Sequence, residues 1–426
     1  MPMRSSRIPQ FYKKTYQERL AILKDDFGLT DEDLLVLRSS DDMQLQVADR
    51  MVENVIATLA LPLGLATNFL INNVDYLVPM SVEESSVIAA ACHAAKLARP
   101  AGGFTVTATH PIMVGQIQLV DVIDSKAAQQ VINNELVMLL AIANSQDEVL
   151  IAKGGGALAI EFKDLVTPRG PMLIVCLVVN VCNAMGSNIV NTMVEKIAPH
   201  IELITGLKAR LKIVSNGASR RIVKARAVWQ RSLIGDDIIE GILDADAFAH
   251  ADPSRAATHN KGIMNGIDAV ALATGNDFRA IEAAAHSYAV RDGEYRPLSR
   301  YYCDDVGDLV GELEIPLAVG IVGGITKTHP MVCIALKILG VDSASSLAQV
   351  MAAVGLAQNF AALRVLVSEG IQKGHMRLHS KNMASNVGAR NEEITLIAEQ
   401  MICEQNISVK RAEELLERLQ KGSLCL

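Results

Sequence analysis

The chain of 426 residues is long enough for two or three domains and a large core. Hydrophobic residues make up 50% and charged residues 20%, which indicates a folded globular protein rather than a disordered one. The formal net charge of −7 argues against a nucleic-acid partner, because such proteins normally present a basic face.

Targeting and metal-binding signals are weak. The longest apolar run, residues 172–179, has the length of a strand, so no membrane span of about 20 residues is predicted. Residues 1–4 lack the apolar run of a signal peptide. The seven cysteines form no Cys-x-x-Cys pair, which indicates reduced thiols rather than a disulfide framework or a zinc site. We therefore expect a cytoplasmic protein with no bound metal and no membrane contact.

The first hundred residues are predicted to form helices, a hairpin and one more helix. These elements are helices within 15–60, strands at 69–71 and 76–78, and a helix over 81–97. Thr30 and Asp33 form a capping pattern that marks a helix start. Glu83 and Glu84 stand in the first turn of the last helix, where the helix dipole favours carboxylates.

The pattern of apolar and polar residues changes near His110. The predicted elements there are strands at 115–120, 173–181 and 211–214, and helices over 125–143 and from 184 onward. This β-α-β-α-β order predicts a compact α/β insert. Residues 221–229 alternate again and are predicted to return the chain to the first domain, and 317–322 read as a further strand. The last fifty residues are predicted to be helical, with one apolar face that includes Leu415 and Leu416.

Two glycine clusters, at 154–156 and 320–324, stand at predicted strand edges. Neither has the Gly-x-Gly-x-x-Gly spacing, so an ordinary Rossmann domain is not indicated. Such glycines bring backbone N–H groups close to a pyrophosphate, but a tight turn explains most clusters of this kind. Residues 183–188 follow a buried strand and open a helix, so they read either as a phosphate site or as a simple capped helix start.

The densest group of polar side chains lies at 252–268 and continues through 273–280. Charges and amides alternate there with small residues, which let a ligand or another segment approach the backbone. This favours a built site over a solvated loop. Further along, His375 and His379 have the i, i+4 spacing of zinc ligands but no third ligand, so proton transfer by one histidine is the better interpretation.

Several short sequence blocks, taken in their order along the chain, resemble those of a class II, bacterial-type 3-hydroxy-3-methylglutaryl-CoA reductase. The resemblance extends over nearly the whole chain. The blocks that carry the resemblance are residues 53–55, 78–84, 184–188, 255–268, 275–277, 355–359 and 374–376. The implied reaction is the reversible four-electron reduction of (S)-3-hydroxy-3-methylglutaryl-CoA to (R)-mevalonate and CoA. It consumes two NAD(P)H and passes through a hemithioacetal and mevaldehyde.

The resemblance implies four catalytic residues, Glu84, Lys261, Asp277 and His375. Lys261 is expected to stabilise negative charge on the carbonyl oxygen during hydride transfer. Asp277 is expected to orient Lys261, and Glu84 to protonate the aldehyde oxygen. His375, on a closing C-terminal segment, is expected to protonate the CoA thiolate.

The resemblance also assigns binding roles. The expected cofactor-binding residues are Asp147, Asn183, Met185, Gly186, Asn188, Gly323 and Gly324. The expected substrate-binding residues are Asn68, Ser86, Arg255, Asn265, Gln358 and Asn359. Asp147 aligns with a carboxylate that receives ribose hydroxyls and would repel a 2′-phosphate, so NAD(H) is favoured over NADP(H). Asn183 and Ser85 depart from the family's usual Asp and its usual Pro or Gly.

The implied fold is α+β and α/β: a large mixed domain, an inserted small ferredoxin-like cofactor-binding domain, and a C-terminal helical flap. The predicted division is residues 1–110 and 216–373 for the large domain, 111–215 for the small domain and 374–426 for the flap. The family implies a homodimer with active sites at the interface, with or without further assembly. Two alternatives stay open: another nicotinamide-dependent acyl-CoA or aldehyde oxidoreductase, and a CoA-ester-binding protein without turnover.

Overall fold

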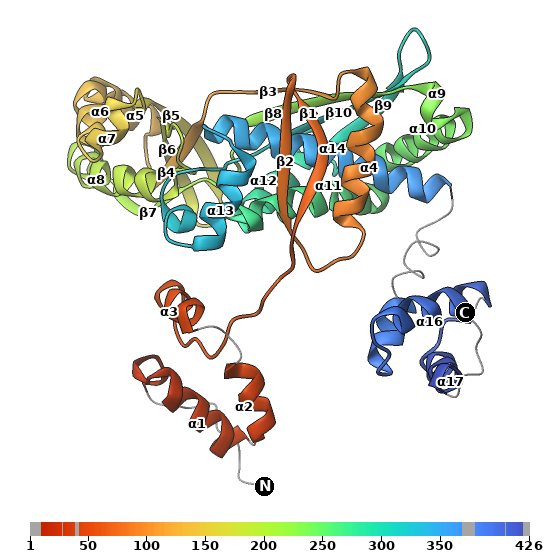
Figure 1. The fold of residues 1–426 in the computed structure, drawn as a ribbon. Helices are drawn as coiled ribbons and strands as arrows, with labels where there is room; N and C mark the ends of the chain where they lie inside the picture. The colour runs from red at the N-terminus through yellow and green to blue at the C-terminus, as the bar shows by residue number, and fades with distance from the viewer. Residues whose placement is uncertain (1–9, 28, 39–41, 369–379, 405, 421–426) are drawn as a thin grey trace.

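Two β-sheets organise the chain in the computed structural model, which describes residues 10–27, 29–38, 42–368, 380–404 and 406–420 (Figure 1). The six-stranded sheet has the order β2 (Val74–Ser81), β1 (Leu63–Ile71), β3 (Phe104–Ala108), β8 (Ile222–Trp229), β10 (Leu309–Pro316), β9 (Ser299–Cys303). The four-stranded sheet has the order β5 (Gly156–Thr167), β6 (Gly170–Asn180), β4 (Ile112–Val120), β7 (Lys208–Val214). The predicted hairpin near residue 72 is confirmed as the antiparallel pair β1–β2.

Helices cover the six-stranded sheet. They are α4 (Val87–Ala98), α9 (Arg231–Ile234), α10 (Asp236–Ala251), α11 (Pro253–Ala273), α12 (Phe278–Ala289), α13 (Pro330–Leu339) and α14 (Ala344–Val367). The core between these layers holds the Trp229 ring, which stacks on Phe360 of α14 with centroids 3.9 Å apart. The indole N–H of Trp229 donates to the Ala94 carbonyl at 3.1 Å, so this large ring fixes α4 and α14 against β8.

Helix α14 has the length and apolar composition of a membrane-crossing helix, contrary to the prediction that the chain contains no such stretch. In this structure, however, 72% of its most apolar stretch is buried inside the protein. It packs against α11 and α4, and Leu347, Met351 and Phe360 are fully buried. Its apolar character is therefore accounted for by its place at the centre of the core.

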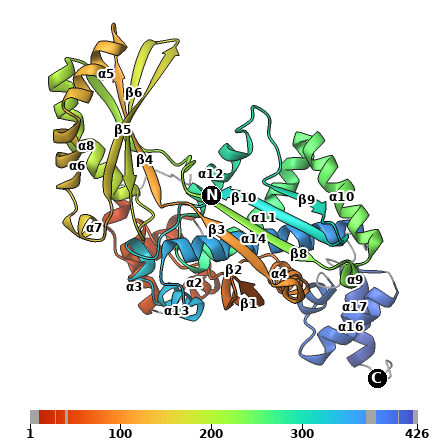
Figure 2. The ribbon, with the colours of Figure 1, turned by 90° about the horizontal axis from the view of Figure 1, so that it is seen from above.

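The four-stranded sheet carries its helices on one face (Figure 2). They are α5 (Ser125–Asn134), α6 (Leu136–Asn144), α7 (Glu148–Ala152) and α8 (Ser187–Thr205). The element order is β-α-β-β-α-β, one strand more than predicted, because β5 was missed. Residues 222–229 return the chain to the six-stranded sheet as β8, as predicted.

Helices at both ends of the chain stand away from the two sheets (Figure 1). They are α1 (Tyr16–Phe27), α2 (Asp31–Arg38), α3 (Asp42–Met51), α16 (Glu392–Cys403) and α17 (Val409–Gln420). The predicted capping pattern is confirmed: the Asp33 carboxylate accepts from the Thr30 N–H at 2.8 Å, and the Asp33 N–H donates to the Thr30 hydroxyl. The predicted apolar face buries Ala412, Leu415 and Leu416.

Three predicted elements differ from the structure. The helix predicted from residue 81 begins at Val87, because residues 82–86 form a turn in which Ser86 has φ = 72°. The helix predicted over 125–143 is divided at Glu135 into α5 and α6. Residues 317–322 are not a strand: Leu317 and Ile321 donate to the carbonyls of Arg221 and Asn183, which lie in loops.

Candidate active site

The polar segment at 252–268 is the start of α11 rather than a loop. The Asp252 carboxylate caps it by accepting from the Ser254 N–H at 2.9 Å, and Pro253 occupies the first position. Its small residues face α14, where a Cβ at Gly266 would lie 3.0 Å from the Gln358 side chain and from the Val354 carbonyl. Gly266 therefore permits close helix packing, while the polar side chains occupy the remaining faces of the helix.

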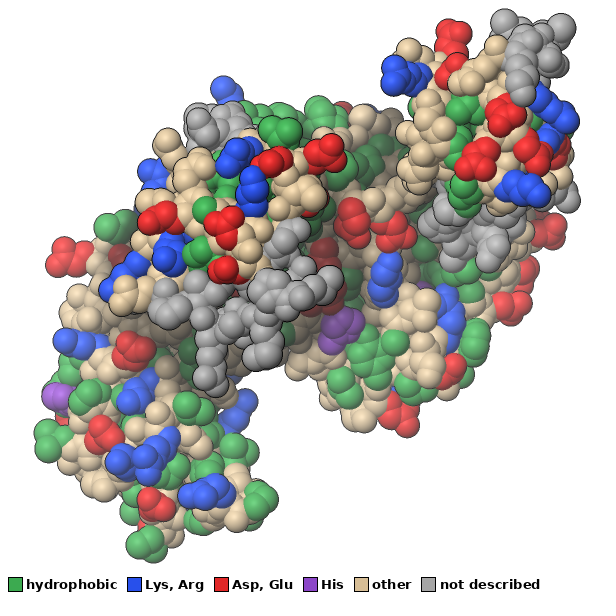
Figure 3. Space-filling view, turned by 90° about the horizontal axis from the view of Figure 1, so that it is seen from below, with side chains coloured by type: hydrophobic (Ala, Val, Ile, Leu, Met, Phe, Trp, Pro, Cys, Tyr) green, Lys and Arg blue, Asp and Glu red, His purple; other side chains and the backbone are tan. Residues whose placement is uncertain are grey.

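Two of the expected catalytic residues meet at α11. The Lys261 ammonium lies 3.2 Å from the Glu84 carboxylate, which the turn between β2 and α4 presents. The Lys261 side chain is 63% exposed and that of Glu84 37%, so the pair is open to a ligand. Seen from below, the molecule has acidic, basic and histidine side chains close together at the edge of a hollow (Figure 3). A fixed cation beside a carboxyl group can stabilise developing negative charge and supply a proton.

Asp277 lies beyond the C-terminal end of α11, at the start of α12. It caps α12, accepting from the N–H groups of Arg279 and Ala280, and its carboxylate pairs with the Arg279 guanidinium at 3.1 Å. With a rise of about 1.5 Å per residue, the twelve residues from Lys261 to the end of α11 span about 18 Å. The expected contact of Asp277 with Lys261 is therefore not made within one chain.

The turn before Asp277 connects this end of α11 to the second glycine cluster. The Asn276 side-chain carbonyl accepts from the Gly320 N–H at 2.8 Å. Gly275 has φ = 65°, and a Cβ there would lie 2.7 Å from the Ile325 side chain. Residues 275–277 and 320–325 are consequently packed side by side.

Residues 183–186, which include three of the expected cofactor-binding residues, lie against the segment 317–322. Arg221, which is 4% exposed, donates to the carbonyls of Ala184, Met185 and Val319 at 3.3, 3.1 and 2.7 Å. Burial lowers the pKa of Arg221 to about 10, and the guanidinium remains charged at neutral pH. A Cβ on Gly320 would lie 2.5 Å from the Met185 nitrogen, so the two segments touch through their backbones.

Gly186, with φ = 106°, precedes the first residue of α8, and Asn188 is exposed in the first turn. Gly323 and Gly324 are exposed, with φ = 83° and 54°. The unpaired N–H groups of a helix N-terminus attract phosphate, and exposed glycines let a ligand approach the backbone. These residues thus fit a dinucleotide.

Asn183 and Asp147 already have local partners. The Asn183 side-chain carbonyl accepts from the Ala344 N–H at 3.0 Å and so helps cap α14. One oxygen of Asp147 accepts from the Leu150 N–H at 2.9 Å and caps α7. The loop after α7 reaches residues 180–182, since the Cys182 thiol lies 3.6 Å from the Lys153 carbonyl. Asp147 therefore belongs to the same end of the four-stranded sheet as 183–188.

The expected substrate-binding residues differ in exposure. Asn68 lies at a bulge of β1 with φ = 71°, and its amide donates to the Thr67 hydroxyl and to the Cys92 carbonyl. Ser86 is exposed, and Arg255 and Asn265 are half-buried on α11. Gln358 is 5% exposed, with a buried side-chain carbonyl that has no hydrogen-bond partner.

Asn359 is 1% exposed and binds protein groups: its side-chain carbonyl accepts from Ser299 and Tyr301, both at 2.8 Å. His375 lies outside the described residues, as does the segment that carries it. The sequence singled out the segment that contains His259 but gave no sign that this side chain is buried on α11, because nothing in the local pattern distinguishes it from a surface residue.

A pair of partly buried carboxyl groups links α11 to α12. Burial and the neighbouring Glu282 carboxylate raise the pKa of Asp268 to about 8. Glu282 also contacts the His286 imidazole at 2.6 Å, and His286 contacts the Tyr295 hydroxyl at 2.7 Å. The Asp268 carboxyl therefore retains its proton at neutral pH and donates it to Glu282.

Comparisons with known proteins identify the family of this chain. A family model described as hydroxymethylglutaryl-coenzyme A reductase matches residues 15–380. A 3-hydroxy-3-methylglutaryl-coenzyme A reductase of Archaeoglobus fulgidus is 53% identical over 416 residues, covering 97% of this chain and 95% of the relative. A probable reductase of the same name from Borreliella burgdorferi is 35% identical and covers 87% of this chain and 84% of its own length.

Solved structures point to the same family. The class II 3-hydroxy-3-methylglutaryl-CoA reductase from Streptococcus pneumoniae, bound to NADPH in open conformations, matches with a TM-score of 0.75 and 40% identity. The match covers 96% of this chain and all of that one. The chain belongs to the hydroxymethylglutaryl-CoA reductase family, and its mixed α/β multidomain fold is that of the class II structures.

The raised pKa of Asp268 predicts a pH-dependent stability. The folded protein keeps a proton that the unfolded chain releases above its ordinary Asp pKa of 3.8, so this contribution to stability is lost as pH rises toward about 8. Asp268→Asn should remove this loss and raise the thermal midpoint at pH 8 relative to the wild type. Thermal melts from pH 5 to 8 test this, with Asp244→Asn, an exposed carboxylate on α10, as the control. If the thermal midpoints of the wild type and Asp268→Asn changed with pH in parallel, the raised pKa of Asp268 would be contradicted.

Proposed function

We propose that this chain catalyses the two-step reduction of 3-hydroxy-3-methylglutaryl-CoA to mevalonate and CoA with two nicotinamide cofactors. The observation that carries the proposal is the Lys261–Glu84 pair, with 3.2 Å between ammonium and carboxylate. It joins α11 to the turn after β2, two segments 177 residues apart in the sequence. The family membership of the chain supplies the substrate class.

The chemistry needs both members of the pair. Each reduction places negative charge on a carbonyl oxygen, and the Lys261 ammonium is placed to stabilise that charge. In the second reduction the oxygen becomes an alcohol and takes up a proton, which Glu84 supplies from its carboxylic acid form and thereby becomes the carboxylate that pairs with Lys261. Between the two steps the CoA thiolate leaves and takes a proton from His375, which prevents the thiolate from adding back to the aldehyde.

The nicotinamide cofactor supplies the hydride when bound. The first turn of α8 with Met185, Gly186 and Asn188 would hold its phosphates, Gly323 and Gly324 would lie beside them, and Asp147 would receive the ribose hydroxyls. The NADPH-bound relative supports a nicotinamide cofactor in general. NAD(H) as the preferred cofactor rests on the carboxylate of Asp147 alone.

The separation of Lys261 from Asp277 supports a site shared between two subunits. Because about 18 Å of helix lies between them in one chain, Asp277 can orient Lys261 only if it comes from a second copy. We therefore propose that the protein is a cytoplasmic homodimer. Each subunit would consist of a large domain, a small domain at 111–215 inserted in it, and a flap at 374–426. Arg255, Asn265, Ser86, Asn68 and Gln358 would contact the substrate.

The activity is tested by following absorbance at 340 nm with hydroxymethylglutaryl-CoA and either cofactor. The wild type should oxidise about two cofactors per thioester, and Lys261→Ala should lower kcat by about 10²–10³-fold, as expected for loss of a group that stabilises an oxyanion. Lys126→Ala, an exposed lysine on α5, is the control and should keep wild-type rates. Turnover only with a different thioester would favour another oxidoreductase, and binding without turnover would favour a CoA-ester-binding protein.

Cofactor preference is tested at Asp147 without disturbing its helix cap. Asp147→Ser keeps a side-chain acceptor for the Leu150 N–H but removes the charge that would repel a 2′-phosphate. The ratio of kcat/KM for NADH over NADPH should fall by about tenfold, or about 1.4 kcal/mol. Glu148→Ala, the neighbouring exposed carboxylate, should leave the ratio unchanged. A ratio that is the same in Asp147→Ser and the wild type would exclude Asp147 as the determinant.

The shared site is tested by mixing two inactive variants, Lys261→Ala and Asp277→Ala. If Lys261 works with Asp277 of the other subunit, each mixed dimer has one intact site, and random exchange should restore about a quarter of the wild-type activity. If both residues work within one chain, no mixed dimer has an intact site and the activity stays at background. As the control, each variant dimer is crosslinked before the two variants are mixed. Because the subunits can then no longer exchange, no activity should be restored.

A further inference from the structure

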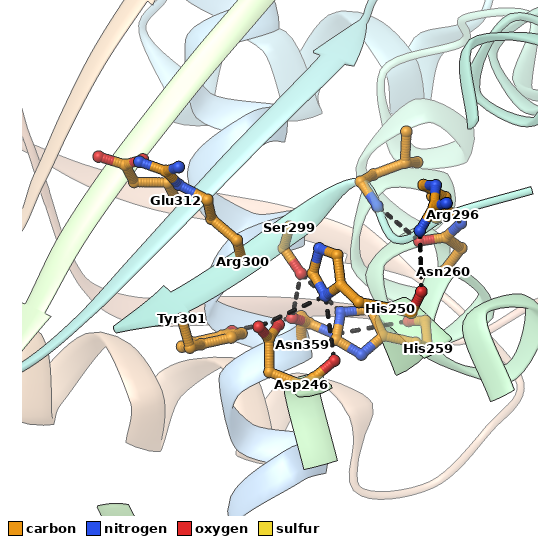
Figure 4. A network of polar contacts seen from close by, with 11 residues as sticks. Asp246, His250, His259, Asn260, Arg296, Ser299, Arg300, Tyr301, Glu312 and Asn359 are labelled. Carbon is orange, nitrogen blue, oxygen red and sulfur yellow. Dashed lines mark hydrogen bonds and ion pairs between the residues drawn. The ribbon is translucent and has the colours of Figure 1, made fainter. Parts of the chain in front are cut away.

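A network of buried polar side chains connects α11 to β9 and α14 (Figure 4). The His259 Nε2 atom lies 2.6 Å from the Ser299 hydroxyl. Ser299 and Tyr301 both donate to the side-chain carbonyl of Asn359, and the Asn359 amide donates to the His259 carbonyl at 3.4 Å. The four residues are between 1% and 6% exposed. We call this group of four the α11 anchor.

The hydrogen-bond directions in the α11 anchor are fully determined. The Ser299 hydroxyl has one proton, which goes to Asn359, so Ser299 can only accept from His259. The imidazole must then carry its proton on Nε2, while its Nδ1 atom is buried without a hydrogen-bond partner. Burial, with the nearby Arg255 charge, lowers the pKa of His259 to about 3, so the ring stays neutral. If any one of these groups donated in the opposite direction, the series of hydrogen bonds would be interrupted.

The burial also excludes a different role for the Ser299–His259 pair. A serine beside an imidazole resembles an activated nucleophile, but Ser299 is 3% exposed and His259 2%. No substrate can reach the hydroxyl, and its proton is already given to Asn359. The pair is therefore a fixed structural contact between α11 and β9.

Asn260 makes a second connection at the next residue of α11. Its amide donates to the Arg296 carbonyl at 3.0 Å, and its side-chain carbonyl accepts from the Leu298 N–H at 2.9 Å. The segment before β9 is thus bound to α11 as a neighbouring strand would be. Two consecutive residues, 259 and 260, hold α11 directly before Lys261.

The packing of α11 on α14 explains why such a connection is needed. A Cβ at Gly262 would lie 3.9 Å from that of Ala362, so the contact opposite Lys261 consists of small groups. At this one position few atoms interlock, so packing alone contributes little to fixing Lys261. Directional hydrogen bonds to buried partners fix the rotation of the helix and its position along its axis.

From this geometry we propose that His259, Ser299 and Asn359 are positioning residues, which set the rotation of α11 and thereby hold the Lys261 ammonium at Glu84. The inference rests on the proposed function for the role of Lys261. It assigns Asn359 to the support of the catalytic helix, because its side-chain carbonyl is occupied by Ser299 and Tyr301. The anchor acts through Lys261 and touches no reacting atom.

The test compares variants that break one bond with a variant that keeps it. Ser299→Ala and His259→Leu should lower kcat by about ten- to hundredfold, as expected for a small displacement of a catalytic group, with KM values within about twofold of the wild type. His259→Gln, which still offers an N–H to Ser299, should recover kcat to within about threefold. Ile132→Val, in the core of the four-stranded sheet, is the control for a loss of buried packing and should lower the thermal midpoint without lowering kcat.

A second measurement does not depend on turnover. Lys261 can be labelled with ¹³C-methyl groups and its resonance assigned through Lys261→Arg. Ser299→Ala should shift this resonance, while Ile132→Val should not. An unchanged resonance, or a kcat for Ser299→Ala within twofold of that for Ile132→Val, would overturn the proposal. If the wild type fails to reduce the thioester while the resonance shifts, the proposed function fails and the positioning role stands.

Discussion

The close packing of α11 against α14 is the constraint on which the rest of the site depends. Glycines on both helices make it possible: a Cβ at Gly266 would collide with Gln358 and Val354, and one at Gly355 would lie 2.9 Å from Ile267. Because the helices approach so closely, side chains from both reach the same region. Lys261, Asn265 and Arg255 come from one helix, and Gln358 and Asn359 come from the other.

Polar groups supply the specificity that small apolar groups cannot. The α11 anchor holds the first half of α11, the Asp268–Glu282 pair joins its second half to α12, and Asn276 connects its end to Gly320. A buried polar group that finds its partners has one acceptable arrangement, whereas apolar surfaces tolerate several. Polar contacts thereby hold α11 at three places along its length.

The 183–186 segment is connected to 317–322 and to α14 by side chains that bind backbone groups. Arg221 binds the carbonyls of the 183–186 and 317–322 segments together, and Asn183 ties the first of them to the start of α14. The helix that packs against α11 thus begins at the loop that contains Asn183.

The sequence by itself determined the family and the strands and helices with strong alternation or capping signals, such as the hairpin at residue 72 and the cap at Thr30. These features are local or lie in short blocks of fixed spacing. The contact between Lys261 and Glu84 was decided by the tertiary structure. Only the tertiary structure decided that the 252–268 segment is helical and that 317–322 is held by Arg221 instead of a sheet. It also decided that Lys261 lies near the middle of α11 while Asp277 lies beyond the end of that helix, at the start of α12. It also decided that His259, Ser299 and Asn359 form one network, since they come from three elements separated by up to 100 residues. The physical reason is that hydrogen bonds between distant segments leave no periodic pattern in the sequence, whereas burial of a helix or strand face does.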